Sequence, residues 1–303
     1  MTCQAAAIAI CGSTRCRYRH HLMNCAGRFF SVVLLIAGMA LAPPALGRSG
    51  SVEFKLTFKD LPAEFKPVEQ QIEANVLSAA RTWADLVDAR PCTIDILFRI
   101  DPAASSGRGS GRSFVTARFK DEKLGDKDVE EQGWAAEMRT GKDPNGNEPD
   151  IELVFEPTYM RTIWWDPQPQ HRRARVPSDK LDGMTVIEHE LAHALAFNGW
   201  INPRTGKFEA NVVSTYDRWV TFDGTDFFFN GPRAKRLWGG PVPLAKTNNN
   251  YHHVCDKPEG PQERLRGDLM NGVRFEYGKR YPIGPLDLAI LADCGVPLKA
   301  HEN

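Results

Sequence analysis

The strongest chemical signal in the sequence is the segment His189-Glu190-Leu191-Ala192-His193. On an α-helix, residues four apart lie on one face, so the imidazoles of His189 and His193 can share one metal ion. Neutral imidazole suits Zn²⁺, and a catalytic zinc site keeps one position open for water. Glu190 is then placed to take a proton from that water. The segment predicts a catalytic zinc site with Glu190 as general base.

A catalytic zinc site needs a third protein ligand. Besides His189 and His193, the histidines after residue 47 are His171, His252, His253 and His301. His171 lies in a basic run and His301 in the last residues, which favours the adjacent pair, His252 or His253. Two carboxylates remain as alternatives, because Glu209 and Asp226 each stand in a partial motif of another class of metallopeptidase.

The motif lies in a pattern typical of a helix that packs on a sheet. Its apolar stripe consists of Ile187, Leu191, Ala194 and Leu195. Ser178 or Asp182 can cap the start of this helix, and Asn198-Gly199 provides a stop.

Other segments supply the elements around this helix. Alternating or continuous apolar residues predict strands over 52–58, 93–100 and 150–155, and helical spacing predicts a helix after Pro67. The Gly/Ser-rich segment 105–111 is expected to be a loop, and the basic run 171–175 a solvated surface loop. The aromatic run 227–229 is expected in the core or in a cleft wall. This order of elements predicts an α+β domain.

The first 47 residues have the pattern of an export signal. They contain four arginines and no acidic residue, followed by an apolar run over 29–42 and then Pro43-Pro44. The run is about 14 residues long, shorter than the roughly 20 that a membrane span needs. Residues 1–47 are therefore expected to be a signal peptide, with Met23 as a possible start. This predicts a secreted or periplasmic protein without stable membrane insertion after processing.

Removal of the signal peptide leaves an acidic protein with three cysteines. The formal charge of the whole chain is zero, but 34 basic against 38 acidic side chains remain without the leader. This balance argues against nucleic acid as a partner. Cys92, Cys255 and Cys294 would lie in a compartment that permits disulfides, so one bridge is possible. Cys255 with Cys294 is one pairing, and Cys92 is an equal contender.

Beyond the motif, the sequence resembles the metzincin-type metallopeptidases. The motif is followed by a distant histidine in Asn250-Tyr251-His252-His253-Val254 and by Gly267-Asp268-Leu269-Met270-Asn271-Gly272, which is similar to the methionine turn of that clan. The long gap before the third histidine resembles the leishmanolysin-like branch and related exported bacterial proteins, as does the segment 281–293. The resemblance covers roughly residues 149–297. The compact metzincin signature is absent, because Ala196 and Gly199 stand where it has Gly and His.

The resemblance implies a zincin-like fold and assigns roles residue by residue. It implies His189, His193 and His253 as zinc ligands, Glu190 as base, and Met270 as support beneath the metal. The fold would be a mixed sheet with an active-site helix over residues 48–199 and a largely irregular subdomain over residues 200–303, together one catalytic domain. Tyr277 or Tyr281 could donate a hydrogen bond to an oxyanion.

These observations predict a secreted zinc endopeptidase that acts on a peptide or protein substrate. The strand over 150–155 is expected at the edge of the cleft, where an extended peptide can pair with it. The alternative is an exported binding or adhesive protein whose zinc is structural or inactive, for which four protein ligands, with His252 and His253 both bound, would be typical. A hydrolase of non-peptide amides is a third possibility.

Overall fold

The computed structural model describes residues 52–104, 109–113, 116–246, 250–255 and 260–300. The predicted signal peptide, residues 1–47, and His301 lie outside these ranges. The α-helices are α1 (Glu69–Leu86), α2 (Gly133–Thr140), α3 (Pro157–Met160), α4 (Gly183–Leu195), α5 (Pro232–Trp238) and α6 (Pro285–Asp293). Short 3-10 helices cover Ala63–Val68, Glu122–Leu124, Asp217–Trp219 and Gly260–Gly267.

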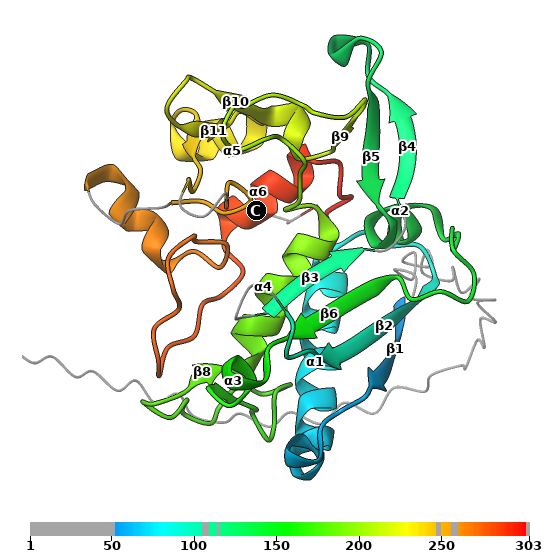
Figure 1. Ribbon diagram of the computed structural model, residues 1–303, viewed down its shortest axis with the longest axis vertical. Helices are drawn as coiled ribbons and strands as arrows, with labels where there is room; N and C mark the ends of the chain where they lie inside the picture. Colours follow the sequence, from blue (N-terminus) through cyan, green and yellow to red (C-terminus); the bar gives the residue numbers. More distant parts are fainter. Residues whose placement is uncertain (1–51, 105–108, 114–115, 247–249, 256–259, 301–303) are drawn as a thin grey trace, which may run out of the picture. The chain divides into compact units, whose positions relative to one another are not determined.

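The main sheet has four strands in the spatial order β1-β2-β6-β3 (Figure 1). Its strands are β1 (Val52–Lys59), β2 (Cys92–Ile100), β6 (Ile151–Phe155) and β3 (Gly109–Ser113). β1, β2 and β6 are parallel, and β3 runs antiparallel to β6. In β1, half-buried and exposed residues alternate as the sequence predicts. All five residues of β6 are buried, because this strand is central and covered on both faces.

Helices α1 and α4 pack side by side against the main sheet (Figure 1). The apolar stripe of α1 includes Ile72, Val76 and Trp83, all fully buried. The indole nitrogen of Trp83 donates a hydrogen bond to the backbone carbonyl of Glu188 on α4, 2.9 Å away. This bond fixes the position of α4 along α1. It therefore also fixes the position of the histidines on α4.

The edge of the sheet differs from the sequence prediction in two ways. Gly109–Ser113 forms strand β3, so the loop prediction is wrong over 109–111, and its part over 105–108 lies outside the described residues. β6 is not the edge strand, because β2 pairs with one side of it and β3 with the other. β3 is thus one of the two terminal strands of the sheet, with β1 at the other side, and it packs directly on α4.

A side-chain cap starts α4, and its end comes earlier than expected. The carboxylate of Asp182, one of the two predicted caps, accepts a hydrogen bond from the backbone nitrogen of Thr185 at 3.1 Å. The helix ends at Leu195, three residues before the predicted stop at Asn198-Gly199. The chain then turns so that the backbone carbonyl of Phe197 faces back toward the helix. There it accepts a hydrogen bond from the ring of His193.

The sequence predicts a solvated loop for the basic run before α4. This prediction is wrong for one residue, Arg172. Its guanidinium contacts the carboxylates of Asp182 and Glu188 at 2.7 and 2.9 Å, and both acids are buried. Burial raises the pKa of Glu188 to about 7, although Arg172 acts in the opposite direction. Arg280 also contacts Asp182, at 3.3 Å. The start of α4 is therefore held by a buried ion-pair network.

The remaining described elements are short and build the other sheets. β4 (Thr116–Lys120), β5 (Asp128–Gln132) and β9 (Val212–Ser214) form one sheet, and β10 (Val220–Phe222), β11 (Phe227–Phe229) and β12 (Val242–Pro243) form another. β7 (Ile163–Trp164) pairs with β8 (Leu181–Asp182). Phe227 and Phe229 are buried in the core. The predicted α+β class is confirmed, with helices and several small sheets, and residues from Leu46 to Asn303 form one unit.

The three cysteines in the described residues are not joined to one another by a disulfide, so neither of the pairings considered from the sequence is present. Cys255 and Cys294 are buried and Cys92 is half-buried. Cys255 lies in the segment next to Met270, and Cys294 ends α6. Among the described residues, no helix has the length and apolar character that would let it cross a membrane.

We expect Arg172→Met to destabilise the fold by about 3–5 kcal/mol, because it leaves the buried carboxylate of Glu188 without its cation and leaves Asp182 with Arg280 alone. Arg173→Met, which changes the exposed neighbour, is the matched control and should cost less than about 0.5 kcal/mol. Urea unfolding followed by tryptophan fluorescence measures both. Equal stabilities of the two variants would contradict the role given to Arg172.

Candidate metal centre

Three histidine side chains from two distant segments meet in one buried cluster. Their ring nitrogens Nε2 lie 3.2 Å apart for His189 and His193, 3.2 Å for His193 and His253, and 3.0 Å for His189 and His253. His189 and His193 come from consecutive turns of α4, as the spacing predicts, and His253 comes from a loop sixty residues later. The three can hold one metal ion.

The other ring nitrogen of each histidine faces a backbone carbonyl oxygen. The Nδ1 atom of His189 lies 2.9 Å from the carbonyl oxygen of Leu269. The Nδ1 atom of His193 lies 2.7 Å from the carbonyl oxygen of Phe197. In His253, Nδ1 lies 3.3 Å from the oxygen of Asn250. A carbonyl only accepts hydrogen bonds, so each Nδ1 carries the proton and each Nε2 presents a lone pair. Three lone pairs therefore face one another.

Burial keeps two of these imidazoles, those of His193 and His253, neutral. It lowers the pKa of His193 to about 4, and it lowers the pKa of His253 well below its ordinary value, with the neighbouring histidines adding to the effect. Neutral imidazole is the form that binds a metal. The cluster is thus ready to bind a cation at neutral pH without first losing protons.

The geometry fits zinc better than it fits a hydrogen-bonded group. In a tetrahedral site with Zn–N distances of about 2.0–2.1 Å, two ligand nitrogens lie about 3.3 Å apart. The observed separations of 3.0–3.2 Å are close to this value. Three neutral rings whose protons all lie on Nδ1 have no hydrogen to share at the centre, and a cation that accepts all three lone pairs would relieve their mutual repulsion.

The structure places His253, and not His252, in the cluster. The Nε2 atom of His252 lies 3.1 Å from the carbonyl oxygen of Gly199. Tyr251 is buried, and its hydroxyl donates to the carboxylate of Asp217 at 2.9 Å. That carboxylate also accepts from the backbone nitrogen of Trp200 at 2.6 Å. Asp217 thus ties the segment after α4 to the segment that carries His253.

The turn at Met270 adjoins both histidine segments. The carbonyl of Leu269 is the partner of His189, and the carbonyl of Met270 accepts from the nitrogen of Val254 at 2.8 Å. The nitrogen of Met270 donates to the carboxylate of Asp268 at 3.0 Å. Met270 itself is fully buried. This turn therefore fixes both the orientation of the His189 ring and the position of the segment that carries His253.

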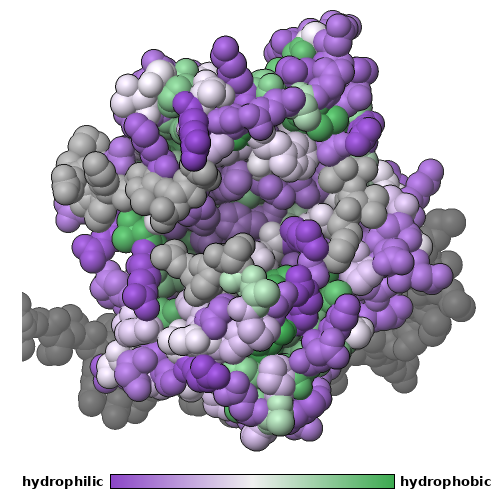
Figure 2. Space-filling model, viewed as in Figure 1, coloured by the Kyte–Doolittle hydropathy of each residue, from purple (hydrophilic) through white to green (hydrophobic). Residues whose placement is uncertain are grey.

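A cleft of about 900 Å³ opens over the cluster, lined by the histidines, Glu190, strand β3 and the segment 271–275. Figure 2 shows the described surface hollowed across its middle, with hydrophilic residues in the hollow. Glu190 is buried, and its Oε1 would lie only 2.9 Å from a Cβ placed on Gly109. A Cβ on Gly111 would collide with the backbone carbonyl of Glu190. The two glycines let β3 lie directly on α4 and place Glu190 beside the cleft.

The alternative ligands and the oxyanion candidates lie elsewhere. Glu209 is exposed and bonded to Asn202, and Asp226 is exposed and paired with Lys246. Neither belongs to the histidine cluster. Tyr281 is buried, and its hydroxyl accepts from the nitrogen of Glu276 at 3.2 Å. Tyr277 is 41% exposed, and neither tyrosine lines the cleft.

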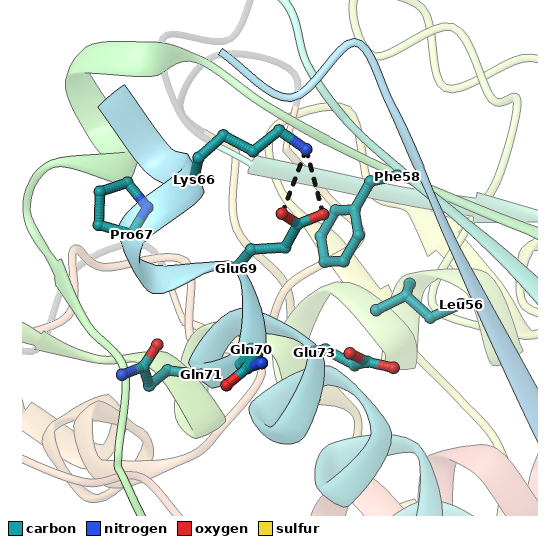
Figure 3. Close-up of a pocket in the computed structure, with 8 residues that line it drawn as sticks. All are labelled: Leu56, Phe58, Lys66, Pro67, Glu69, Gln70, Gln71 and Glu73. Carbon is teal, nitrogen blue, oxygen red and sulfur yellow. Dashed lines mark hydrogen bonds and ion pairs between the residues drawn. The ribbon is translucent and has the colours of Figure 1, made fainter. Parts of the chain in front are cut away.

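A second hollow, of about 550 Å³, lies between β1 and the start of α1 (Figure 3). Its lining includes an ion pair between Lys66 and Glu69, 3.1 Å long, beside the apolar side chains of Leu56 and Phe58. It contains no histidine or cysteine among its lining residues. The cleft over the histidines, not this hollow, has the chemistry of an active site.

Sequence reasoning missed the residues that position the site. Gly109 and Gly111 were assigned to a loop, although isolated glycines in a short strand also indicate a close backbone approach. Tyr159, which lines the cleft from α3, has no sequence signal that separates it from a core residue. The carboxylate of Asp217 gives no signal either, because its role depends on the fold around it.

We expect the purified chain to contain one transition-metal ion, zinc included, per molecule. His253→Ala should lose it, because two imidazoles remain, whereas His252→Ala is the matched control and should keep it. Plasma emission spectroscopy of both variants measures the metal content. Metal loss in His252→Ala with retention in His253→Ala would reverse the assignment.

We also expect the metal-free chain to lose stability as the pH falls from about 6.5 toward 4. In that interval the unfolded chain binds a proton on His193, whose pKa is about 4 in the fold, so protonation favours unfolding. The effect is at most about 3 kcal/mol for this residue. The control is His171→Asn, which changes an exposed histidine. As the pH is lowered, its free energy of unfolding should fall more steeply than that of His193→Asn. Identical slopes would contradict the assignment.

Comparisons with family models, with curated proteins and with solved structures gave no match for this chain. The candidate metal centre therefore rests on its own geometry. The resemblance to metzincins, which depends on the sequence motifs, stays a prediction.

Proposed function

We propose that this chain is an exported zinc-dependent endopeptidase with a zincin-like fold. His189, His193 and His253 would hold the zinc, and Glu190 would be the general base. The single observation that carries the proposal is the convergence of three Nε2 atoms beside a buried glutamate at the floor of a cleft. When bound, zinc supplies a Lewis acid that polarises a carbonyl and lowers the pKa of water.

The protein's own groups would perform the proton transfers. Glu190 follows His189 directly on α4 and lines the same cleft, so its carboxylate can accept a proton from the attacking water. It can then donate this proton to the leaving amine. The backbone carbonyls of Leu269 and Phe197 hold the imidazoles in one tautomer during these steps.

An extended peptide would bind along β3. This strand is the terminal strand of the main sheet on the side of the cleft, and residues from Gly109 to Arg112 line the cleft. Free backbone groups at a sheet edge can pair with a peptide by β-strand addition. The proposal therefore moves the substrate-binding edge from β6, where the sequence places it, to β3.

The position of His252 weighs against a structural zinc site. A structural site is usually closed by four protein ligands. His252, the fourth ligand that such a site would use, faces the carbonyl of Gly199 instead. The position that a substrate or water needs therefore stays open on the side of the cleft.

We expect Glu190→Gln to keep the metal and to lower the rate of peptide cleavage by a factor of about 10²–10⁴, because the variant lacks the base. Glu209→Gln is the matched control, since Glu209 is exposed and lies outside the histidine cluster. Cleavage of a quenched fluorescent peptide library, with metal content measured in parallel, tests both. Full activity of Glu190→Gln would refute the role of this residue, and an intact metal without any cleavage by the wild type would favour a binding protein.

A further inference from the structure

Three carboxylates form a second cluster away from the histidine cleft. Glu137 lies on α2, Asp143 in the loop that follows, and Asp150 directly before β6. Their nearest oxygens lie within 4.8 Å of one another. Among the described residues, no Lys or Arg forms an ion pair with any of the three, so no cationic side chain offsets the charge that the cluster carries when it is ionised.

Two of these carboxylates are buried with an oxygen that has no partner. Glu137 is 2% exposed and Asp150 is 3% exposed. Oε2 of Glu137 and Oδ1 of Asp150 receive no N–H or O–H donor from the described residues. Burial, reinforced by the charge of Asp150, raises the pKa of Glu137 to about 8. An unsatisfied buried carboxylate oxygen is costly, and two facing each other require either a shared proton or a cation.

The surrounding hydrogen bonds hold these oxygens in place. Oδ2 of Asp150 accepts from the nitrogen of Asp95 at 2.8 Å, which leaves only Oδ1 free. Oδ1 of Asp143 accepts from the nitrogens of Asn145 and Gly146 at 2.8 and 2.7 Å, so the loop fixes this carboxylate. The side-chain oxygen of Asn145 is also buried without a donor.

We propose that Glu137, Asp143 and Asp150 bind a calcium ion. The available donors are all oxygens, which hard cations prefer and which suit zinc poorly. Calcium accepts six to eight oxygen ligands in a flexible arrangement, whereas magnesium demands a near-ideal octahedron. Because Asp143 is exposed, water can complete the coordination from the solvent side.

The ion would fasten α2 and its loop to the end of the main sheet. The carbonyl of Asp150 accepts from the hydroxyl of Ser113 at 3.0 Å, and Ser113 is the last residue of β3. The same hydroxyl accepts from the nitrogen of Trp134, on α2, at 3.2 Å. The proposed site thus supports the edge strand of the cleft from its far end, and it does not depend on the proposed peptidase activity.

The test is calcium binding to the full chain after passage over a chelating resin, by calorimetry and by thermal unfolding, with magnesium as the comparison ion. We expect one calcium per chain and a rise in Tm of roughly 5–10 °C at a calcium concentration of about one hundred times Kd. Asp143→Asn keeps the acceptor for the loop nitrogens, so it should fold normally. It should bind calcium at least about tenfold more weakly, because charge count sets affinity.

Glu137→Gln, which preserves shape, should abolish the rise in Tm. Asp85→Asn, a change of equal charge at an exposed position on α1, is the control and should bind calcium like the wild type. A wild type without calcium binding would overturn the proposal in favour of a shared proton. Tighter binding of magnesium, or equal calcium affinity in Asp143→Asn and Asp85→Asn, would overturn it as well.

Discussion

The structure depends on one constraint, which is that three clustered imidazoles each have Nδ1 directed at a backbone carbonyl. The carbonyls of Leu269, Phe197 and Asn250 come from three separate segments. Each one fixes a ring tautomer and a ring plane, so the Nε2 lone pairs converge. Such partners orient metal ligands and increase their basicity. Without a cation the arrangement is electrostatically unfavourable, and this cost is the reason to infer a metal.

Much of the fold holds the segments that carry the histidines and these three carbonyls in place. The ion pairs of Arg172 anchor the first turn of α4, and Trp83 holds its middle. Asp217 joins the chain after α4 to Tyr251, and the turn at Met270 pairs with Val254. Buried networks of this kind are costly when one member is lost, because the remaining groups stay unsatisfied. A substitution far from the cleft can therefore remove the metal.

The sequence allowed the α+β class, the motif helix and its two histidines to be predicted, because each depends on local spacing. His189 and His193 follow from helical periodicity alone, whereas the choice of His253 over His252 came from a family resemblance. Strand β3 was missed, since Gly109 and Gly111 suit a loop by composition and suit a strand only when α4 lies against them. Arg172 was missed because its buried partners are set by tertiary packing. The sequence left the pairing of the cysteines open, because a count of cysteines holds no information on distance.

The central claim is that zinc is bound by three imidazoles and one exchangeable oxygen. X-ray absorption at the zinc edge of the purified chain tests it most directly. The account predicts three nitrogen ligands at about 2.0–2.1 Å, with the signature of imidazole rings, and one oxygen at about 2.0–2.2 Å. A sulfur ligand at about 2.3 Å, a fourth imidazole, or a chain purified without zinc would contradict it.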